Sequence, residues 1–279
     1  MSGKVLTMYL MDGDPIGRIK CKIANWTGIV YKIPRISIDN CDDIQELTQS
    51  GVYLLFGTDK DENTVVYIGQ AGNRKNGRGL LQRICEPHNS IDYWSEVIIL
   101  TTGDGSFGPT EISYLENRLF NMARKAGRYD AKNSNDPNPG NVTEEKECEL
   151  EEFINYARIA VGAIGHRVFE PIALPAESRN SEPILHMEYK GAIAKGQCTS
   201  EGFVVFKGSS VNPETTKKCP SHVTKNRKKY ADMINEENKL TADVFFDSPS
   251  AAAGFVGGTS LNGKVKWIDD SGRALREIM

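Results

Sequence analysis

Two tyrosines and one glutamate occupy positions that suggest chemistry as well as packing. Tyr53 and Tyr67 lie in apolar runs, 52–56 and 65–68, that flank a polar loop. β-Branched and aromatic residues on both sides of a loop rich in Gly, Asp and Asn predict a β-hairpin. Pairing of its strands would bring the tyrosines close together. Glu116 lies at the edge of the apolar stripe of a predicted helix, where a carboxylate is costly unless it is paired or binds a metal.

The elements that would position these residues follow in order along the chain. A cationic, glycine-rich loop, 71–79, comes directly after the hairpin and leads into a predicted helix over 80–86. Residues 93–102 predict a third strand, because their centre is continuously apolar. The clearest helix covers 110–125, with Thr110 as its expected N-cap and apolar residues at helical spacing.

The triplets GVY at 51–53 and YIG at 67–69, in this order on one predicted hairpin, resemble the GIY-YIG nuclease superfamily. The resemblance covers roughly residues 51–171, with Val52 where isoleucine is usual. It implies an α+β fold, in which helices flank a small antiparallel sheet. It also implies a metal-dependent endonuclease that hydrolyses phosphodiester bonds in DNA, with RNA as a further possible substrate. The alternative is a catalytically inactive protein of the same fold that binds or senses nucleic acid.

The resemblance also implies roles for six residues. The catalytic positions are Tyr53, Tyr67, Arg83, His88 and Asn133, and Glu116 is the ligand of magnesium or another divalent metal ion. Such a metal neutralises charge that develops on the phosphate, and an arginine can bind phosphate in a bidentate way. A tyrosine, with a reference pKa of about 10, becomes a base only where nearby positive charge lowers that pKa. The sequence does not decide which tyrosine is the base.

Each of these residues also has a structural alternative. A tyrosine in a strand usually packs against its cross-strand neighbours, and an arginine beside an apolar helix face usually extends along the surface. Glu116 could form an ion pair with Arg83, and Asn133 could be a turn residue. Structural or exposed positions are expected for the histidines His88, His166, His186 and His222.

Local basic segments are the expected contacts with nucleic acid, since the net charge of −3 gives the whole chain no attraction for phosphate. The candidates are Arg74, Lys75 and Arg78 in the loop after the hairpin, and Lys225, Arg227, Lys228 and Lys229 near the C-terminus. For both segments, a simple solvated surface is the alternative.

The C-terminal part contains FVVFKGS, SPSAAAGFVGG and LNGKVKW. These segments resemble a domain of unassigned role that follows GIY-YIG modules and is attached to some restriction enzymes and adenine methylases. The resemblance implies contact with nucleic acid. Within it, Ser248 and Pro249 predict the start of a helix, as N-cap and first helical residue.

The domain organisation expected from these patterns has four parts. A β-rich N-terminal extension, 1–50, packs on a nuclease-like domain, 51–174. A polar linker bounded by prolines, 175–183, then leads to a second, smaller α+β domain, 184–279.

Composition indicates a protein of the cytoplasm that does not enter membranes. The chain has no apolar run of about 18 residues, and its N-terminus lacks the apolar segment of a signal peptide. Its six scattered cysteines include no C-x-x-C pair, which favours free thiols in a reducing compartment. Nothing in the sequence indicates the oligomeric state.

Overall fold

The computed structural model describes residues 3–60, 62–72, 79–88, 91–133, 135–171, 183–199, 201–216 and 219–279. The chain divides into two compact units, Met1–Pro171 and Ile172–Met279. Each unit combines a sheet with helices, so the predicted α+β class is confirmed. Among the described residues, no helix has the length and apolar character needed to cross a membrane.

The first unit is built on a seven-stranded sheet of order β1-β2-β3-β6-β4-β5-β7. Its strands are β1 (Leu6–Leu10), β2 (Ile19–Ile23), β3 (Gly28–Pro34), β4 (Gly51–Thr58), β5 (Thr64–Ala71), β6 (Glu96–Thr102) and β7 (Asp130–Ala131). Neighbouring strands are antiparallel, except that β7 pairs with β5 in parallel. The sheet is therefore larger than the small antiparallel sheet that was expected.

Residues 1–50 do not form a separate layer on this sheet but supply three of its strands. The connection is the β3–β6 pair, which runs without interruption from Gly28 opposite Thr102 to Pro34 opposite Glu96. The sheet consequently continues from the N-terminal strands into the β4–β5 hairpin, and the N-terminal segment and the hairpin share one hydrophobic core on each face.

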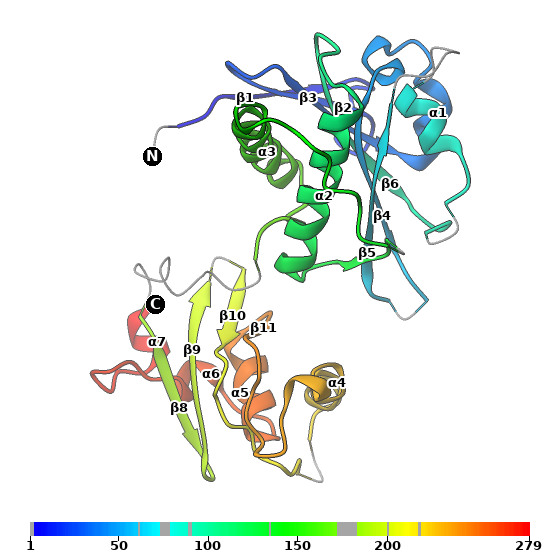
Figure 1. Ribbon diagram of the computed structural model, residues 1–279. Helices are drawn as coiled ribbons and strands as arrows, with labels where there is room; N and C mark the ends of the chain where they lie inside the picture. The colour runs from blue at the N-terminus through cyan, green and yellow to red at the C-terminus, as the bar shows by residue number, and fades with distance from the viewer. Residues whose placement is uncertain are drawn as a thin grey trace. The chain divides into compact units, whose positions relative to one another are not determined.

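Helices cover both faces of the sheet (Figure 1). They are η1 (Arg35–Asn40), η2 (Gln45–Thr48), α1 (Gly79–Cys85), α2 (Pro109–Ala126) and α3 (Glu144–Ala163), η denoting a 3-10 helix. Because side chains alternate along a strand, β4 contributes to two cores. Val52 and Leu54 pack with α2 and α3, whereas Tyr53 and Leu55 pack with α1, η1 and η2.

The helix α2 forms where the apolar spacing predicts it, and its buried face includes Leu115 and Leu119. Its start differs from the expectation, because Gly108 is the N-cap and Pro109 is the first helical residue. Proline suits that position, since its fixed φ matches the helix and it has no N–H to leave unsatisfied. Thr110 therefore lies inside the helix and is not its cap.

The second unit contains a four-stranded antiparallel sheet of order β11-β10-β9-β8. Its strands are β8 (Leu185–Tyr189), β9 (Ala192–Thr199), β10 (Gly202–Val205) and β11 (Val244–Phe246). Its helices are α4 (Ser221–Lys229), η4 (Ala231–Met233), α5 (Pro249–Gly257), α6 (Gly263–Lys266) and α7 (Leu275–Ile278). The predicted start of α5 is confirmed, because the Ser248 side chain accepts a hydrogen bond from the Ala251 amide.

Candidate active site on the β4–β5 hairpin

The hairpin register places the two tyrosines on one face of the sheet. Tyr53 lies opposite Gly69, and Tyr67 lies opposite Leu55, so the tyrosines are diagonal neighbours. Their ring centroids are 6.3 Å apart. The sequence-based expectation that strand pairing brings them together is met by this geometry.

Close contacts explain the glycine in each triplet. A Cβ at Gly69 would lie 2.4 Å from the Tyr53 hydroxyl oxygen, so the Tyr53 ring occupies the space above that residue. A Cβ at Gly51 would lie 2.4 Å from the carbonyl oxygen of Leu100 on β6. Gly69 thus makes room for a side chain, and Gly51 makes room for the backbone of the neighbouring strand.

The hydroxyl of Tyr53 is buried and has no hydrogen-bond partner in the part of the chain that the structure describes. The residue is 0 % exposed, and its oxygen is among the few buried side-chain polar atoms that no other group satisfies. Burial raises the pKa of Tyr53 well above its ordinary value, and the nearby Tyr67 adds to this effect. The charge of Arg83 acts in the opposite direction, and that of Glu116 in the same direction. Tyr53 is therefore protonated at neutral pH and can donate a hydrogen bond, but it is unsuited to be a base.

His88 joins the tyrosines from the loop after α1. It is 6 % exposed, and its ring centroid lies 5.7 Å from that of Tyr53 and 5.5 Å from that of Tyr67. Nε2–H donates to the backbone carbonyl of Arg83 at 3.2 Å. Burial, assisted by the Arg83 charge, lowers the pKa of His88, so the imidazole is neutral at pH 7. His88 is thus placed beside the predicted catalytic tyrosines, in a buried position.

Glu116 comes from α2, which covers the other face of the sheet, and meets β5 at Gln70. The Gln70 amide Nε2 donates to Glu116 Oε2 at 2.9 Å and also lies 3.1 Å from Ser113 Oγ. Burial raises the pKa of Glu116, although the Gln70 bond and the charge of Arg83 both favour the ionised form. The half-buried carboxylate is thus held by an amide.

The ion pair between Glu116 and Arg83, weighed from the sequence as an alternative, is not formed. Arg83 Nη1 instead pairs with Glu86 Oε2 at 3.0 Å, one turn further along the chain. Arg83 is still near enough for its charge to act on Tyr53, His88 and Glu116. The two helices therefore bring one cation and one carboxylate to the same end of the hairpin from opposite faces of the sheet.

Gln70 is a site residue that the sequence analysis missed. It directly follows the YIG triplet, and strand alternation puts it on the same face as Val66 and Ile68, which are buried. A long polar side chain in register with core residues was the signal that could have identified it. Its partner on α2 could not have been deduced, since that contact joins residues 46 positions apart.

Asn133 binds backbone and so has a positioning role in this geometry. Its Nδ2 donates to the Ile68 carbonyl at 2.7 Å, and its Oδ1 accepts from the Ile68 amide at 3.1 Å. The side chain therefore pairs with β5 as another strand would, one residue before Gly69 and next to Tyr67. Asn133 fixes the strand that carries the second triplet, and it is not a turn residue exposed to solvent.

The remaining histidines are His166 in the first unit and His186 and His222 in the second. His166 Nε2 contacts Glu96 Oε1 at 2.5 Å, and Lys32 Nζ lies 3.1 Å from the other oxygen of Glu96. His186 Nε2 contacts Asp270 at 2.7 Å in the second unit, and His222 is exposed. These positions agree with the structural or exposed roles expected for the three residues.

The basic residues expected to contact nucleic acid fall into two groups. Arg74, Lys75 and Arg78 lie outside the described residues. The other group is on α4, where Lys225, Lys228 and Lys229 are exposed.

The expectation for Arg227 was wrong. Its guanidinium points into the second unit, where it donates to the carbonyl oxygens of Phe255, Asn212 and Val256 at 2.6, 2.8 and 3.2 Å. It also lies over the Phe255 ring, at 5.1 Å from its centroid. Two of these carbonyls belong to the last turn of α5, so Arg227 caps the C-terminus of that helix and is unavailable to phosphate.

Comparison with known proteins identifies only the second unit. Residues 185–279 match the family described as "Domain of unknown function (DUF4357)", which covers β8 to the end of the chain. No curated protein and no solved structure matches the chain. The match agrees in position with the C-terminal domain to which the sequence patterns pointed, and it assigns no activity.

Proposed function

We propose that the first unit is a metal-dependent endonuclease that hydrolyses phosphodiester bonds in DNA. The observation that carries the proposal is the buried Tyr53 hydroxyl without a partner, with Tyr67 and His88 around it and the charges of Arg83 and Glu116 nearby. A phenylalanine would fill the same space without leaving a buried polar group unsatisfied. The hydroxyl has no acceptor in the described part of the chain, and a phosphate oxygen would accept the hydrogen bond that a protonated tyrosine donates once the side chains that bury Tyr53 make room.

The burial of the two tyrosines suggests different roles for them. Tyr53 is fully buried and stays protonated, so it would donate to a phosphoryl oxygen. Tyr67 is half-buried and can meet water, so it would accept the proton of the attacking water. Arg83 would bind the phosphate through the guanidinium N–H groups that do not face Glu86.

The surroundings of Glu116 fit a divalent metal. Its carboxylate is half-buried, its pKa is raised by burial, and the Gln70 amide is its only hydrogen-bonding partner among the described residues, so a cation would compensate its charge. The described residues contain no cluster of three or more His, Cys, Asp or Glu side chains that could hold a metal. The remaining ligands would be water and phosphate oxygens, as is usual for Mg²⁺. A metal bound there would neutralise charge that develops on the phosphate during hydrolysis.

The second unit would add affinity for DNA through α4. Lys225, Lys228 and Lys229 are exposed on this helix, in a chain of net charge −3. Each lysine that contacts a phosphate releases counterions, so log affinity falls with log salt by about 0.9 per contact. Lys225→Glu, Lys228→Glu and Lys229→Glu together should weaken binding of duplex DNA in fluorescence anisotropy and reduce that slope. An unchanged slope would leave α4 as a solvated surface.

Cleavage of supercoiled plasmid with Mg²⁺ or Mn²⁺, and with a chelator as control, tests the activity. Glu116→Gln should abolish cleavage but leave the fold intact, whereas Glu111→Gln changes a carboxylate on the same helix outside the site and should not affect cleavage. Parental activity in Glu116→Gln would refute the assignment. DNA binding by the parental protein without cleavage, with either metal, would favour the alternative of an inactive binding protein. A structured RNA assayed in parallel decides between the two nucleic acids.

A further inference from the structure

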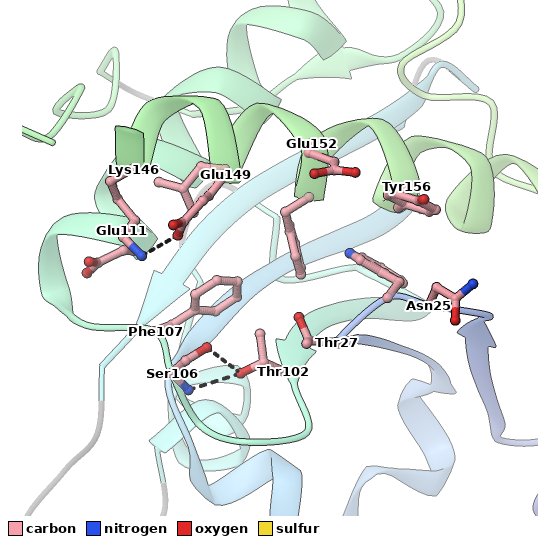
Figure 2. Close-up of a pocket in the computed structure, with 13 residues that line it drawn as sticks. Asn25, Thr27, Thr102, Ser106, Phe107, Glu111, Lys146, Glu149, Glu152 and Tyr156 are labelled. Atoms are coloured by element: carbon pink, nitrogen blue, oxygen red, sulfur yellow. Dashed lines mark hydrogen bonds and ion pairs between the residues drawn. The ribbon is translucent and has the colours of Figure 1, made fainter. Parts of the chain in front are cut away.

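A second concave site lies on the first unit, formed by α3, the turn before β3 and the loop after β6 (Figure 2). This site, the Trp26 cavity, has a volume of about 270 Å³. Figure 2 shows Glu149, Glu152 and Tyr156 along α3, with Phe107 and Thr27 on the facing side. None of the residues of the candidate active site on the β4–β5 hairpin lines this cavity.

Aromatic rings form much of the wall of the Trp26 cavity. The Trp26 and Tyr156 rings are stacked, with centroids 5.8 Å apart and planes inclined by 16°. Phe153 lies between Trp26 and Phe107, with centroid distances of 4.9 Å and 5.0 Å. The faces of such rings carry negative electrostatic potential and attract cations. The wall therefore brings several aromatic rings to the cavity, where they can attract a cation.

Carboxylates outnumber cations among the residues that line the cavity. Glu149 pairs with Lys146, the single basic residue of the lining. Glu111 and Glu152 line it as well, and Glu152 forms no ion pair within the described part of the chain. Aromatic faces and an excess of negative charge favour the same kind of ligand, because both stabilise a cation and neither stabilises an anion.

The chain itself provides an example of a cation on this wall. Lys4 Nζ lies 4.3 Å from the centroid of the Tyr156 ring and donates to the Tyr156 hydroxyl at 2.9 Å. Lys4 does not line the cavity. The Tyr156 ring thus already supports an ammonium group at the edge of the cavity.

One polar atom of the wall has no partner among the described residues. The indole nitrogen Nε1 of Trp26 is buried and makes no hydrogen bond to any of them. A buried N–H group without an acceptor is unfavourable, and the neighbouring side chains Phe153 and Tyr156 offer the indole mainly their rings. A ligand that carries an oxygen acceptor beside its charge would satisfy this donor once the side chains that bury the nitrogen shift to admit it.

We propose that the Trp26 cavity binds a small organic cation, a quaternary ammonium group that carries a hydrogen-bond acceptor a few bonds away. The aromatic wall contacts the methyl groups of the ammonium, the carboxylate of Glu152 balances its charge, and the Trp26 indole donates to its oxygen. The volume of about 270 Å³ suits a small metabolite. The proposal is independent of the nuclease function.

The test uses choline, with two analogues that each lack one of the features required. Tetramethylammonium has the charge without the acceptor, and 3,3-dimethylbutan-1-ol has the shape and the hydroxyl without the charge. Binding is followed on the full chain by the indole N–H resonance of Trp26 in NMR, which the Trp26→Phe variant identifies. We expect choline to bind with a Kd of about 1 mM or tighter. The neutral alcohol should bind at least about tenfold more weakly.

Two substitutions separate charge from hydrogen bonding. Glu152→Gln should weaken choline about fivefold without affecting the neutral alcohol, whereas Glu144→Gln, on the same helix outside the cavity, should change neither. Trp26→Phe keeps an aromatic face but removes the N–H, so choline should then bind no better than tetramethylammonium. Because this variant lacks the reporter indole, its binding is followed by the methyl resonances of the two ligands. The proposal is overturned if the alcohol binds as tightly as choline. It is equally overturned if Glu152→Gln has no effect, or if choline at about 10 mM leaves the Trp26 resonance in place.

Discussion

Replacing Tyr53 by phenylalanine should raise stability while it removes activity. The substitution deletes one oxygen and keeps the ring that packs against Gly69, Tyr67 and His88. A buried polar group without a partner costs about 1–3 kcal/mol. Removing it should therefore raise the free energy of unfolding of the first unit by about 1 kcal/mol, in contrast to the usual loss on truncating a buried side chain.

A matched substitution gives the opposite sign. Tyr114 is also buried, but its single hydroxyl proton is shared between Glu151 Oε1 at 2.8 Å and Glu147 Oε1 at 3.1 Å. Tyr114→Phe removes hydrogen bonds to charged acceptors and should lower stability by about 1.5 kcal/mol. In urea, with a slope of about 2 kcal/mol per molar, the two midpoints should move apart by about 1 M.

The assay is urea unfolding followed by circular dichroism, combined with plasmid cleavage in the presence of metal. If the Tyr53 hydroxyl binds phosphate, Tyr53→Phe should lose about 10²-fold in rate at unchanged or higher stability. A loss of stability like that of Tyr114→Phe would show that the hydroxyl has a partner inside the protein. Higher stability with parental activity would show that it takes no part in the reaction.

Three further predictions concern charge. Because burial raises the pKa of Glu116, the folded protein binds this proton more tightly than the unfolded chain does. Without metal, the free energy of unfolding should therefore fall as pH rises from about 4.5 through the raised pKa. Glu116→Gln should lack this fall when urea unfolding is measured across the pH range. Burial lowers the pKa of His88, so the unfolded chain takes up the proton first as pH falls, and the free energy of unfolding should decrease below about pH 6.5. His88→Asn should flatten that dependence. If the variant and the parental protein show the same pH profile, His88 is in contact with water. In Arg227→Lys, the lysine cannot donate to all three carbonyl oxygens that Arg227 contacts, so the second unit should lose about 2 kcal/mol of stability in thermal unfolding. The salt dependence of DNA binding should not change. A smaller salt slope would mean that Arg227 contacts phosphate.

Local periodicity was sufficient to predict the hairpin and the helix α2. The alternation of side chains on β4 and β5 determines which residues share a face, so it placed Tyr53 beside Tyr67. The 3.6-residue period located Glu116 at the margin of an apolar stripe, where the structure shows a half-buried carboxylate. These inferences hold because each depends on residues close in sequence.

Contacts between distant segments could not be predicted in the same way. The pairing of β3 with β6 joins residues about 70 positions apart, and no local pattern in 1–50 reveals that these strands enter the same sheet. The strand β9 contains Gly, Ala and Lys, which have low β propensity, and the sequence analysis found neither this strand nor its partner β8.

The error at Arg227 was avoidable. Val223, four residues earlier on α4, is buried. Residues four apart share a helix face, so this spacing directs Arg227 inward, whereas Lys225, Lys228 and Lys229 were correctly placed at the surface. A run of basic residues was treated as one surface, although the helical period divides it.

Gly51 and Gly69, the glycines of the two triplets, differ in whether a larger residue could replace them after other side chains of the protein have changed. Gly51 faces a backbone carbonyl of β6, which no change of side chain can move, so any larger residue there is excluded in every sequence background. Gly69 faces two side chains, because a Cβ there would lie 2.4 Å from the Tyr53 hydroxyl and 2.9 Å from Cε1 of Tyr67, so its constraint is eased but not removed when Tyr53 becomes smaller. The order of mutations therefore matters at one position only: a lineage that first loses Tyr53 needs only a shift of the Tyr67 ring to lose Gly69, and the reverse order is blocked. Among homologous chains, a side chain at the position of Gly69 should accompany a missing first tyrosine, and it would mark members that have given up the chemistry while keeping the sheet.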